Sequence, residues 1–504
     1  MNLLAQADHA IDALIARGFA ARANPWRHLG ALTTLALTIT VLSGVVAYAL
    51  YDTSIDGAYQ SGLRLQNDSS GLGAILRGLH RYGADAFMVL MGLHLVRELL
   101  RGHYRGARWF SWLTGVPLIW LAWISGLTGL WLLWDARSLH SVMSTAEWLQ
   151  CLPLIGEGVV RNFLAADAMN DRFFSLVMFL HIGIPLFLIG ALWTHLQRIR
   201  LPDLWPARDA TLGVIAIFVV LGLYAPARSL GLADPHFMPA QLSIDWFFLF
   251  PHALADLTSS AWTWGLAGAF TLLIGALPWL GNGKALAPQR AVVDLSNCNG
   301  CSRCAVDCPF GAITIAPRTD GRKHPREAVV DPDLCTACGI CVGACPSSTP
   351  FRRIEDLVSG IELPDQPIGH LRTALREGLK NRPASDVVLV CGCRFGNGAV
   401  SSDSILPIEL ECLGMLPPSF IDYALRQGVA GVVLAGCGDC NCEYRLGERW
   451  TTERIEGLRE PHLRRIVPRE RLIVLTDRAS ADGIRATTHA LLEHSSETST
   501  GVCS

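Results

Sequence analysis

The sequence predicts a multi-domain protein in which an all-α bundle of six transmembrane helices is followed by an α+β domain and a small α/β domain. Three observations predict this fold class. The 504 residues are 51% hydrophobic and only 17% charged, which is too apolar for a wholly soluble protein. The apolar segments long enough to span a bilayer all lie before residue 285. After that residue, short apolar strands alternate with polar stretches, and fourteen of the sixteen cysteines lie between Cys298 and Cys442.

Six apolar segments are expected to cross the membrane, at about 30–50, 75–99, 112–134, 173–196, 210–226 and 261–281. No cleavable signal pattern precedes the first, so we expect it to remain as a membrane helix. Basic loops follow the second segment ("RELLRGHYRGARW") and the fourth ("QRIRLPDLWPARDA"), and the N-terminal segment is also rich in arginine. The positive-inside rule therefore predicts that the N-terminus and everything after the sixth span lie in the cytoplasm.

Two pairs of histidines recur at one spacing in the apolar segments. His80 and His94 are fourteen residues apart in the second segment, and His181 and His195 are fourteen apart in the fourth. Fourteen helical steps of about 100° return a side chain to within ~40° of the same face. One such pair could be two core histidines, but the second pair favours ligation: His80 with His181 near the outer membrane face and His94 with His195 near the inner one. Each pair suits a haem iron bound from both sides.

Glycines repeat the same spacing in the other two helices of the expected bundle. Gly30 and Gly44 are fourteen residues apart in the first segment, as are Gly115 and Gly129 in the third. A haem edge needs close approach of the backbone, which glycine permits. Plain helix packing in membranes also uses glycine, so it is the match with the histidine spacing that makes these pairs informative.

With these motifs, the segment 26–281 resembles the cytochrome b of quinol-oxidising cytochrome bc complexes. The resemblance implies a four-helix bundle with two b haems, a homodimer of this part, and pairing of Arg77 and Arg97 with haem propionates. For Arg97, a positive-inside charge at a helix end is the alternative.

The stretch "SIDWFFLF", residues 243–250, resembles the Pro-Glu-Trp-Tyr stretch that lines the quinol oxidation pocket of that family. Ile244 replaces the proline, Asp245 the glutamate and Phe247 the tyrosine, while Trp246 is retained. The resemblance implies that Asp245 accepts a proton from quinol and that Trp246 helps to bind the quinone. An interfacial loop anchored by aromatic side chains is the alternative.

Two cysteine runs follow the short linker "GNGKALAPQ". "CNGCSRCAVDCP" and "CTACGICVGACP" both have the C-x2-C-x2-C-x3-C-P spacing of bacterial two-cluster ferredoxins, in which the fourth cysteine of each run ligates the other cluster. The resemblance implies two 4Fe–4S clusters; structural zinc is the weaker alternative. The first cluster would take Cys298, Cys301, Cys304 and Cys345, and the second Cys335, Cys338, Cys341 and Cys308.

The last domain alternates β-branched runs with helical stretches, which predicts a small α/β fold with cysteines at its strand ends. It resembles the iron–sulfur delta subunit of methyl-viologen-reducing hydrogenases, which carries a 2Fe–2S cluster next to a flavin-containing subunit of heterodisulfide-reductase type. The resemblance implies Cys393, Cys412, Cys437 and Cys442 as ligands, with Cys391 and Cys440 as extra or alternative ligands. Mixed C-x-C and C-x2-C spacings also suit zinc.

The expected domains are a transmembrane cytochrome b domain (1–284), a two-cluster ferredoxin domain (285–355), a linker (356–385) and a delta-subunit-like domain with a polar tail (386–504). Cys151 and Cys503 receive no role. Neither a C-x-x-C-H motif nor a glycine-rich dinucleotide motif occurs, so no attached c-type haem is expected and flavin must come from another subunit. The net charge of −2 gives no reason to expect nucleic acid as a partner.

These observations predict a subunit of a respiratory complex in the cytoplasmic membrane of a bacterium or archaeon. It would link the quinone pool, through two b haems and the clusters, to a cytoplasmic flavin-containing oxidoreductase. That partner would be a heterodisulfide-reductase-like flavoprotein or a hydrogenase or formate dehydrogenase module. Two alternatives are a bifurcating quinol oxidase with an external high-potential acceptor, and a membrane anchor that only recruits a soluble enzyme.

Overall fold

The computed structural model describes residues 3–20, 23–152, 169–234, 236–237, 241–243, 245, 247–280, 289–353, 357–380, 382–396, 400–438, 441–475 and 480–500. Internal contacts divide the chain into two compact units. The first comprises residues 1–197 and 202–281, and the second comprises residues 198–201 and 282–504. The second unit therefore contains both cysteine-rich domains expected from the sequence.

The described part of the first unit is helical. Its helices are α1 (Leu3–Ile15), α2 (Leu29–Tyr48), α3 (Ile55–Gln66), α4 (Leu72–Leu100), α5 (Trp109–Trp131), α6 (Ala136–Gln150), α8 (Asp171–Leu196), α9 (Arg208–Tyr224), α10 (Phe250–Leu257) and α11 (Ser260–Ala276). All six segments predicted to span the membrane are helical, as α2, α4, α5, α8, α9 and α11. Three stretches, Pro25–Tyr48, Gly106–Trp131 and Asp171–Leu196, are long and apolar enough to cross a membrane by length and composition.

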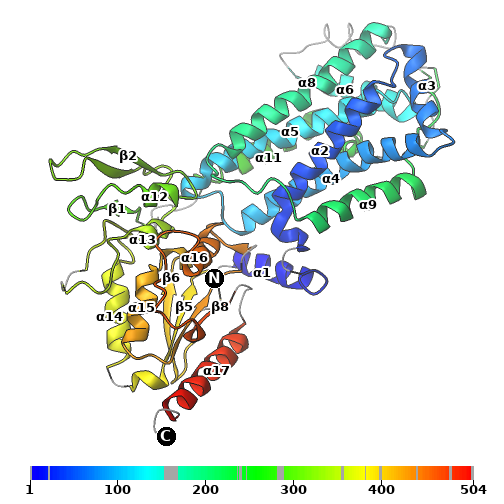
Figure 1. Ribbon diagram of the computed structural model, residues 1–504. Helices are drawn as coiled ribbons and strands as arrows, with labels where there is room; N and C mark the ends of the chain where they lie inside the picture. Colours follow the sequence, from blue (N-terminus) through cyan, green and yellow to red (C-terminus); the bar gives the residue numbers. More distant parts are fainter. Residues whose placement is uncertain are drawn as a thin grey trace. The chain divides into compact units, whose positions relative to one another are not determined.

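Two helix pairs form the frame of this unit. Helix α2 packs along α4, and α5 packs along α8 (Figure 1). Aliphatic side chains fill the space between the pairs, with Leu37, Leu118, Ala122 and Leu188 buried together. Large apolar side chains such as Phe187 and Leu272 point outward and are more than half exposed. An apolar outer surface around a packed interior is what a lipid environment requires.

The second unit begins with two short antiparallel sheets. Strand β1 (Val292–Val293) pairs with β4 (Ile361–Glu362), and β2 (Ile313–Pro317) pairs with β3 (Arg326–Val330). Two short helices, α12 (Arg303–Val306) and α13 (Ile340–Ala344), each lie within a cysteine run. This is the α+β domain that the cysteine runs predict.

The remainder of the second unit is a four-stranded parallel sheet in the order β6-β5-β7-β8. Its strands are β5 (Val388–Cys393), β6 (Ile405–Leu410), β7 (Gly431–Ala435) and β8 (Leu472–Leu475). The helices are α14 (Ile368–Gly378), α15 (Pro418–Arg426), α16 (Gly447–Glu456) and α17 (Ala481–Thr500). The chain leaves β5 first for β6 on one side and then for β7 on the other, which makes a topological switch point at the carboxyl end of β5.

The stretch 356–385, predicted to be a linker, is ordered in its described part. It supplies β4, which pairs with β1, and α14, which packs on β6. Ile368, Leu371 and Leu375 of α14 are buried in the core of the parallel sheet. The prediction was wrong here because the segment is rich in polar residues, as loops are. These residues obscured the amphipathic pattern of α14. The linker "GNGKALAPQ" (281–289) lies outside the described residues except for Gln289.

Candidate redox centres

His80 and His181 face each other across the bundle. Their ring centroids are 6.1 Å apart and their planes are inclined by 76°. Two imidazoles on opposite sides of one metal, with bonds of about 2 Å, place their ring centres about 6 Å apart. The separation therefore leaves the space that one bound iron requires.

Backbone carbonyls fix the protonation of both rings. His80 donates from Nδ1 to Thr40 O over 2.9 Å, and His181 donates from Nδ1 to Ser125 O over 2.9 Å. A carbonyl oxygen can only accept, so each Nδ1 carries the proton and each Nε2 keeps its lone pair. That tautomer is the one a metal ligand needs.

The four predicted glycines lie beside the four predicted histidines. A Cβ at Gly44 would be 2.8 Å from His80 Cε1, and one at Gly129 would be 2.6 Å from His181 Cε1. The corresponding distances are 3.6 Å from Gly30 to His94 and 3.2 Å from Gly115 to His195. Each histidine ring thus lies against a glycine of the neighbouring helix, and the first two positions leave no room for any side chain.

The predicted propionate partners are both buried. Arg77 donates to Gly62 O (2.8 Å), to Gln66 Oε1 (3.2 Å) and to Ser229 Oγ (3.1 Å), which are all neutral oxygens. Arg97 is 7% exposed, and its Nε lies 4.0 Å from Asp8 Oδ1 on α1. None of these three hydrogen-bond partners of Arg77 is an anion. Its guanidinium is therefore suited to bind a carboxylate such as a haem propionate.

Asp245 is buried and forms an ion pair with Arg81. Its other oxygen accepts hydrogen bonds from the backbone of Phe247 and Phe248 at 3.1 and 3.0 Å. Arg81 also binds Asp85 Oδ2 at 3.0 Å, while Asp85 Oδ1 is buried with no hydrogen bond to any described residue. We did not predict Arg81 or Asp85, although their i,i+4 spacing on one helix was a usable signal. Trp246 and Ile244 lie outside the described residues.

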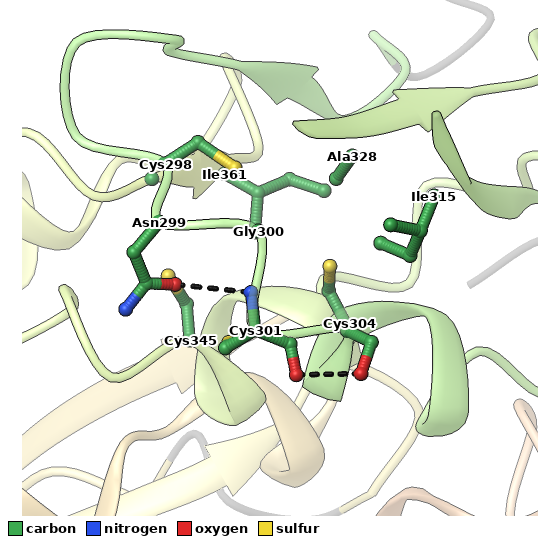
Figure 2. Close-up of a pocket in the computed structure, with 11 residues that line it drawn as sticks. Cys298, Asn299, Gly300, Cys301, Cys304, Ile315, Ala328, Cys345 and Ile361 are labelled. Carbon is green, nitrogen blue, oxygen red and sulfur yellow. Dashed lines mark hydrogen bonds between the residues drawn. The ribbon is translucent and has the colours of Figure 1, made fainter. Parts of the chain in front are cut away.

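The first predicted cysteine set surrounds one pocket. Figure 2 shows Cys298, Cys301, Cys304 and Cys345 around this pocket of about 310 Å³, with Ile315 and Ala328 lining it as well. The second set, Cys308, Cys335, Cys338 and Cys341, lines a pocket of about 320 Å³. The exchange of the fourth cysteine between the runs, which the ferredoxin resemblance implies, is therefore the arrangement that the structure shows.

Buried thiols in these two pockets resist ionisation. Burial, followed by the neighbouring Cys345 sulfur, raises the pKa of Cys304 to about 12, and burial raises the pKa of Cys338 to about 12. Thiolates at such sites need a compensating cation. Iron supplies that charge, so the donor set fits iron–sulfur clusters. Among the described residues, no group of three or more histidine, cysteine or acidic side chains is arranged around a single metal ion.

Four cysteines of the last domain form a ring of sulfur contacts. Cys393 and Cys442 each interact through hydrogen bonds with Cys412 and Cys437, and these bonds lower the pKa of Cys393 and of Cys442. Leu413 donates its backbone N–H to Cys393 Sγ at 3.2 Å. Cys391 is buried, and burial raises its pKa to about 12. Cys440 lies outside the described residues.

The parallel sheet explains why three of these four cysteines meet. Cys393 ends β5, Cys412 follows β6 by two residues, and Cys437 follows β7 by two residues. The carboxyl ends of parallel strands lie at one edge, and this edge includes the switch point beside β5. Cys391 is two residues earlier on β5, so its side chain points to the same face but lies deeper in the core.

Three family models match consecutive parts of the chain. They are Cytochrome b/b6/petB at residues 17–201, the 4Fe-4S dicluster domain at 297–349, and the delta subunit of methyl-viologen-reducing hydrogenase at 396–487. The menaquinol:cytochrome c reductase cytochrome b subunit of Geobacillus thermodenitrificans is 32% identical over 190 residues, covering 35% of this chain and 83% of that protein. The chain belongs to the cytochrome b family. The predicted order of three fused modules is confirmed.

A second curated relative agrees with that placement. The menaquinol:cytochrome c reductase cytochrome b subunit of Bacillus subtilis (strain 168) is also 32% identical over 190 residues, with the same coverage. A chain of a solved "Hyperthermophilic respiratory Complex III" matches with a TM-score of 0.43 and 19% identity, covering 54% of this chain and 80% of that chain. Cytochrome b implies haem b, and the dicluster domain implies 4Fe–4S clusters. The chain is thus a membrane electron-transfer subunit.

Proposed function

We propose that this cytochrome b links the quinone pool to a cytoplasmic flavin-containing oxidoreductase. Two b haems would be held by His80 with His181 and by His94 with His195. Two 4Fe–4S clusters and one 2Fe–2S cluster would continue the path on the cytoplasmic side. The observation that carries this proposal is the presence, in one chain, of two glycine-flanked histidine pairs and three separate four-cysteine sets.

The haems and clusters supply reversible one-electron transfer when bound. The protein residues supply fixed positions for them. The carbonyls of Thr40 and Ser125 hold His80 and His181 in the ligating tautomer. The flanking glycines let the helix backbone approach the rings, and Arg77 offers its guanidinium to an anionic group.

Quinol oxidation releases protons as well as electrons, so the outer site needs a proton acceptor. We assign this role to Asp245. Its Oδ2 lies on Arg81 and its Oδ1 caps the turn at Phe247 and Phe248, so the carboxylate is fixed in place. Asp85 shares Arg81 and is the second carboxylate within reach of that cation.

The proposed partner rests on two observations, a match to a hydrogenase delta subunit and the lack of a dinucleotide motif in the sequence. The delta-subunit match ties the last domain to a hydrogenase-type redox module. Because the sequence contains no dinucleotide motif, we assign flavin to a separate heterodisulfide-reductase-like, hydrogenase or formate dehydrogenase subunit. The basic loops after the second and fourth spans support a cytoplasmic location for the cysteine-rich unit.

The test is quinol-driven reduction of the full chain in detergent, followed by haem absorbance and by electron paramagnetic resonance of the clusters. Menaquinol should reduce the haems first and the clusters afterwards. His80→Ala or His181→Ala should halve the pyridine haemochrome content, because each haem needs both ligands. His94→Ala or His195→Ala should also halve it, and should block reduction of the clusters while quinol still reduces the remaining haem.

His140→Ala is the matched control, because His140 lies on α6 with a side chain 35% exposed and belongs to neither pair. It should leave haem content and reduction unchanged. A protein that binds both haems but is not reduced by quinol would contradict the proposal and favour the membrane-anchor alternative. Reduction that requires an added external high-potential acceptor would favour the bifurcating alternative.

A further inference from the structure

Within the second unit, the second ferredoxin cysteine set and the C-terminal cysteine ring are in direct backbone contact. The short helix α13 carries Cys341, and the turn η6 (Leu413–Met415) directly follows Cys412. A Cβ on Gly343 of α13 would overlap Gly414 O of η6, and a Cβ on Gly447 would overlap Cys412 Sγ. Glycine is required at both positions because the chains approach too closely for any side chain.

A buried ion pair closes the same junction. Arg454 on α16 is 0% exposed and Asp307 is 2% exposed. Arg454 NH2 lies 2.5 Å from Asp307 Oδ2, and its NH1 donates to Gly414 O over 2.8 Å. Asp307 adjoins Cys308, a member of the second cysteine set, and Gly414 follows Cys412 by two residues. One guanidinium therefore binds both sides of the junction.

The charges at this junction are buried to different degrees. Arg459 Nη1 also binds Asp307, at 2.7 Å through Oδ1, so two arginines share one carboxylate. Glu453 binds Arg459 (2.7 Å) and Arg449 (2.9 Å) on the solvent side, where Arg449 is 64% exposed. Buried Glu448 accepts the Gly438 N–H at 2.9 Å, so the three arginines face three carboxylates. The positive charge on Arg454 is the one that solvent screens least, because Arg454 is fully buried.

We propose that Arg454 is a positioning and potential-setting residue for electron transfer between the second 4Fe–4S site and the C-terminal site. It joins Asp307, which precedes Cys308, to Gly414 of η6, so the two thiolate sites stay at a fixed separation. Its positive charge also stabilises the reduced, more negative form at both sites. The step involves one electron leaving one site and arriving at the other, with no bond made or broken. This inference rests on the proposed clusters at these two sites but not on quinone or on the partner.

The test is a redox titration of the full chain, with the cluster signals followed by electron paramagnetic resonance. Arg454→Met removes the charge and keeps most of the apolar volume, so both adjacent centres should become harder to reduce. We expect the ratio of reduced to oxidised centre at a given potential to fall on the order of tenfold, which is about 59 mV for one electron. Asp307→Asn removes the opposing charge, so the same ratio should rise.

The opposite signs separate an electrostatic role from a structural one. A junction that is only loosened would shift both variants in the same direction or lose signal in both. Arg454→Lys keeps the charge but not the two-sided fork, so it should keep the potentials and slow the passage of electrons between the two sites. Arg449→Gln removes an exposed charge from the same helix and should change nothing.

Shifts of one sign in Arg454→Met and Asp307→Asn, or no shift in either while the clusters remain, would overturn the proposal. If Arg454→Met loses a cluster through misfolding, two other variants still test the proposal. Asp307→Asn tests the direction of the potential shift, and Arg454→Lys tests whether the two-sided contact sets the rate of electron passage. Failure of this test is distinct from failure of the proposed function, because haem reduction by quinol would continue in every one of these variants.

Discussion

The four glycines beside the histidines give a graded prediction. Carbon atoms in ordinary contact are about 3.5 Å apart, so alanine at Gly129, whose Cβ would lie 2.6 Å from His181, requires that ring to retreat by about 0.9 Å. The same reasoning gives about 0.7 Å at Gly44 and about 0.3 Å at Gly115, with no retreat needed at Gly30. The His80–His181 site should therefore be far more sensitive than the His94–His195 site.

The cost at the sensitive site follows from two contributions. Overpacking a filled position costs about 1–3 kcal/mol, and a retreating His181 ring also loses its bond to Ser125 O, which is worth about 1 kcal/mol. A total of about 2–4 kcal/mol lowers haem affinity by roughly 30- to 1,000-fold. Purified Gly129→Ala protein should then contain about half the haem of the wild type, measured as pyridine haemochrome per chain.

Two other glycines serve as controls for this series. Gly92 on α4 and Gly183 on α8 have no atom within 4 Å of an added Cβ. Alanine at either position should leave both haems in place, and its higher helix propensity is favourable there. Full haem content in Gly129→Ala, or equal loss of haem in Gly30→Ala and Gly129→Ala, would show that the glycines do not shape the haem sites.

Two further predictions concern single side chains. Asp245→Asn should slow quinol-dependent haem reduction by about 10²-fold or more, because the amide cannot accept the proton. Asp85→Asn should slow it less. If stopped-flow kinetics show a slower haem reduction in Asp85→Asn than in Asp245→Asn, Asp85 is the proton acceptor instead. Cys437→Ser should abolish the third iron–sulfur resonance signal and spare the 4Fe–4S signals, whereas Cys391→Ser should keep all three. A purified chain with stoichiometric zinc in place of that third centre would contradict a 2Fe–2S assignment.

The sequence predicts those features that depend on local periodicity. The fourteen-residue spacing of His80 with His94 and of Gly30 with Gly44 is a statement about one helix at a time, and helix geometry converts it into a shared face. The cysteine runs behave in the same way, because their spacing determines which sulfurs can reach one cluster. Both kinds of pattern are visible without knowing how the elements pack.

Features that depend on distant parts of the chain were not predicted. Arg81 meets Asp245 across 164 positions and Arg454 meets Asp307 across 147, and no local pattern connects either pair. Helix α14 was assigned to a linker because its apolar face is buried only by packing against the parallel sheet, which the sequence of the segment does not reveal. The choice of four ligands among the six cysteines of the last domain was likewise left open by the sequence. The strand order brings Cys393, Cys412 and Cys437 together, and their role as ligands stays a prediction.

The cysteine sites also differ in how burial acts on charge, which the sequence could not show. In the ferredoxin sites, burial, with a smaller contribution from neighbouring sulfurs, raises the pKa of Cys304 and Cys338 to about 12, so ligation at neutral pH must release protons as iron binds. In the C-terminal ring, hydrogen bonds between the sulfurs lower the pKa of Cys393 and Cys442 and raise the pKa of Cys412 and Cys437, so protons there stay on Cys412 and Cys437. The buried guanidinium of Arg454 binds Gly414 O on the turn that follows Cys412. A fixed positive charge next to this ring favours both retention of an anionic centre and its reduction.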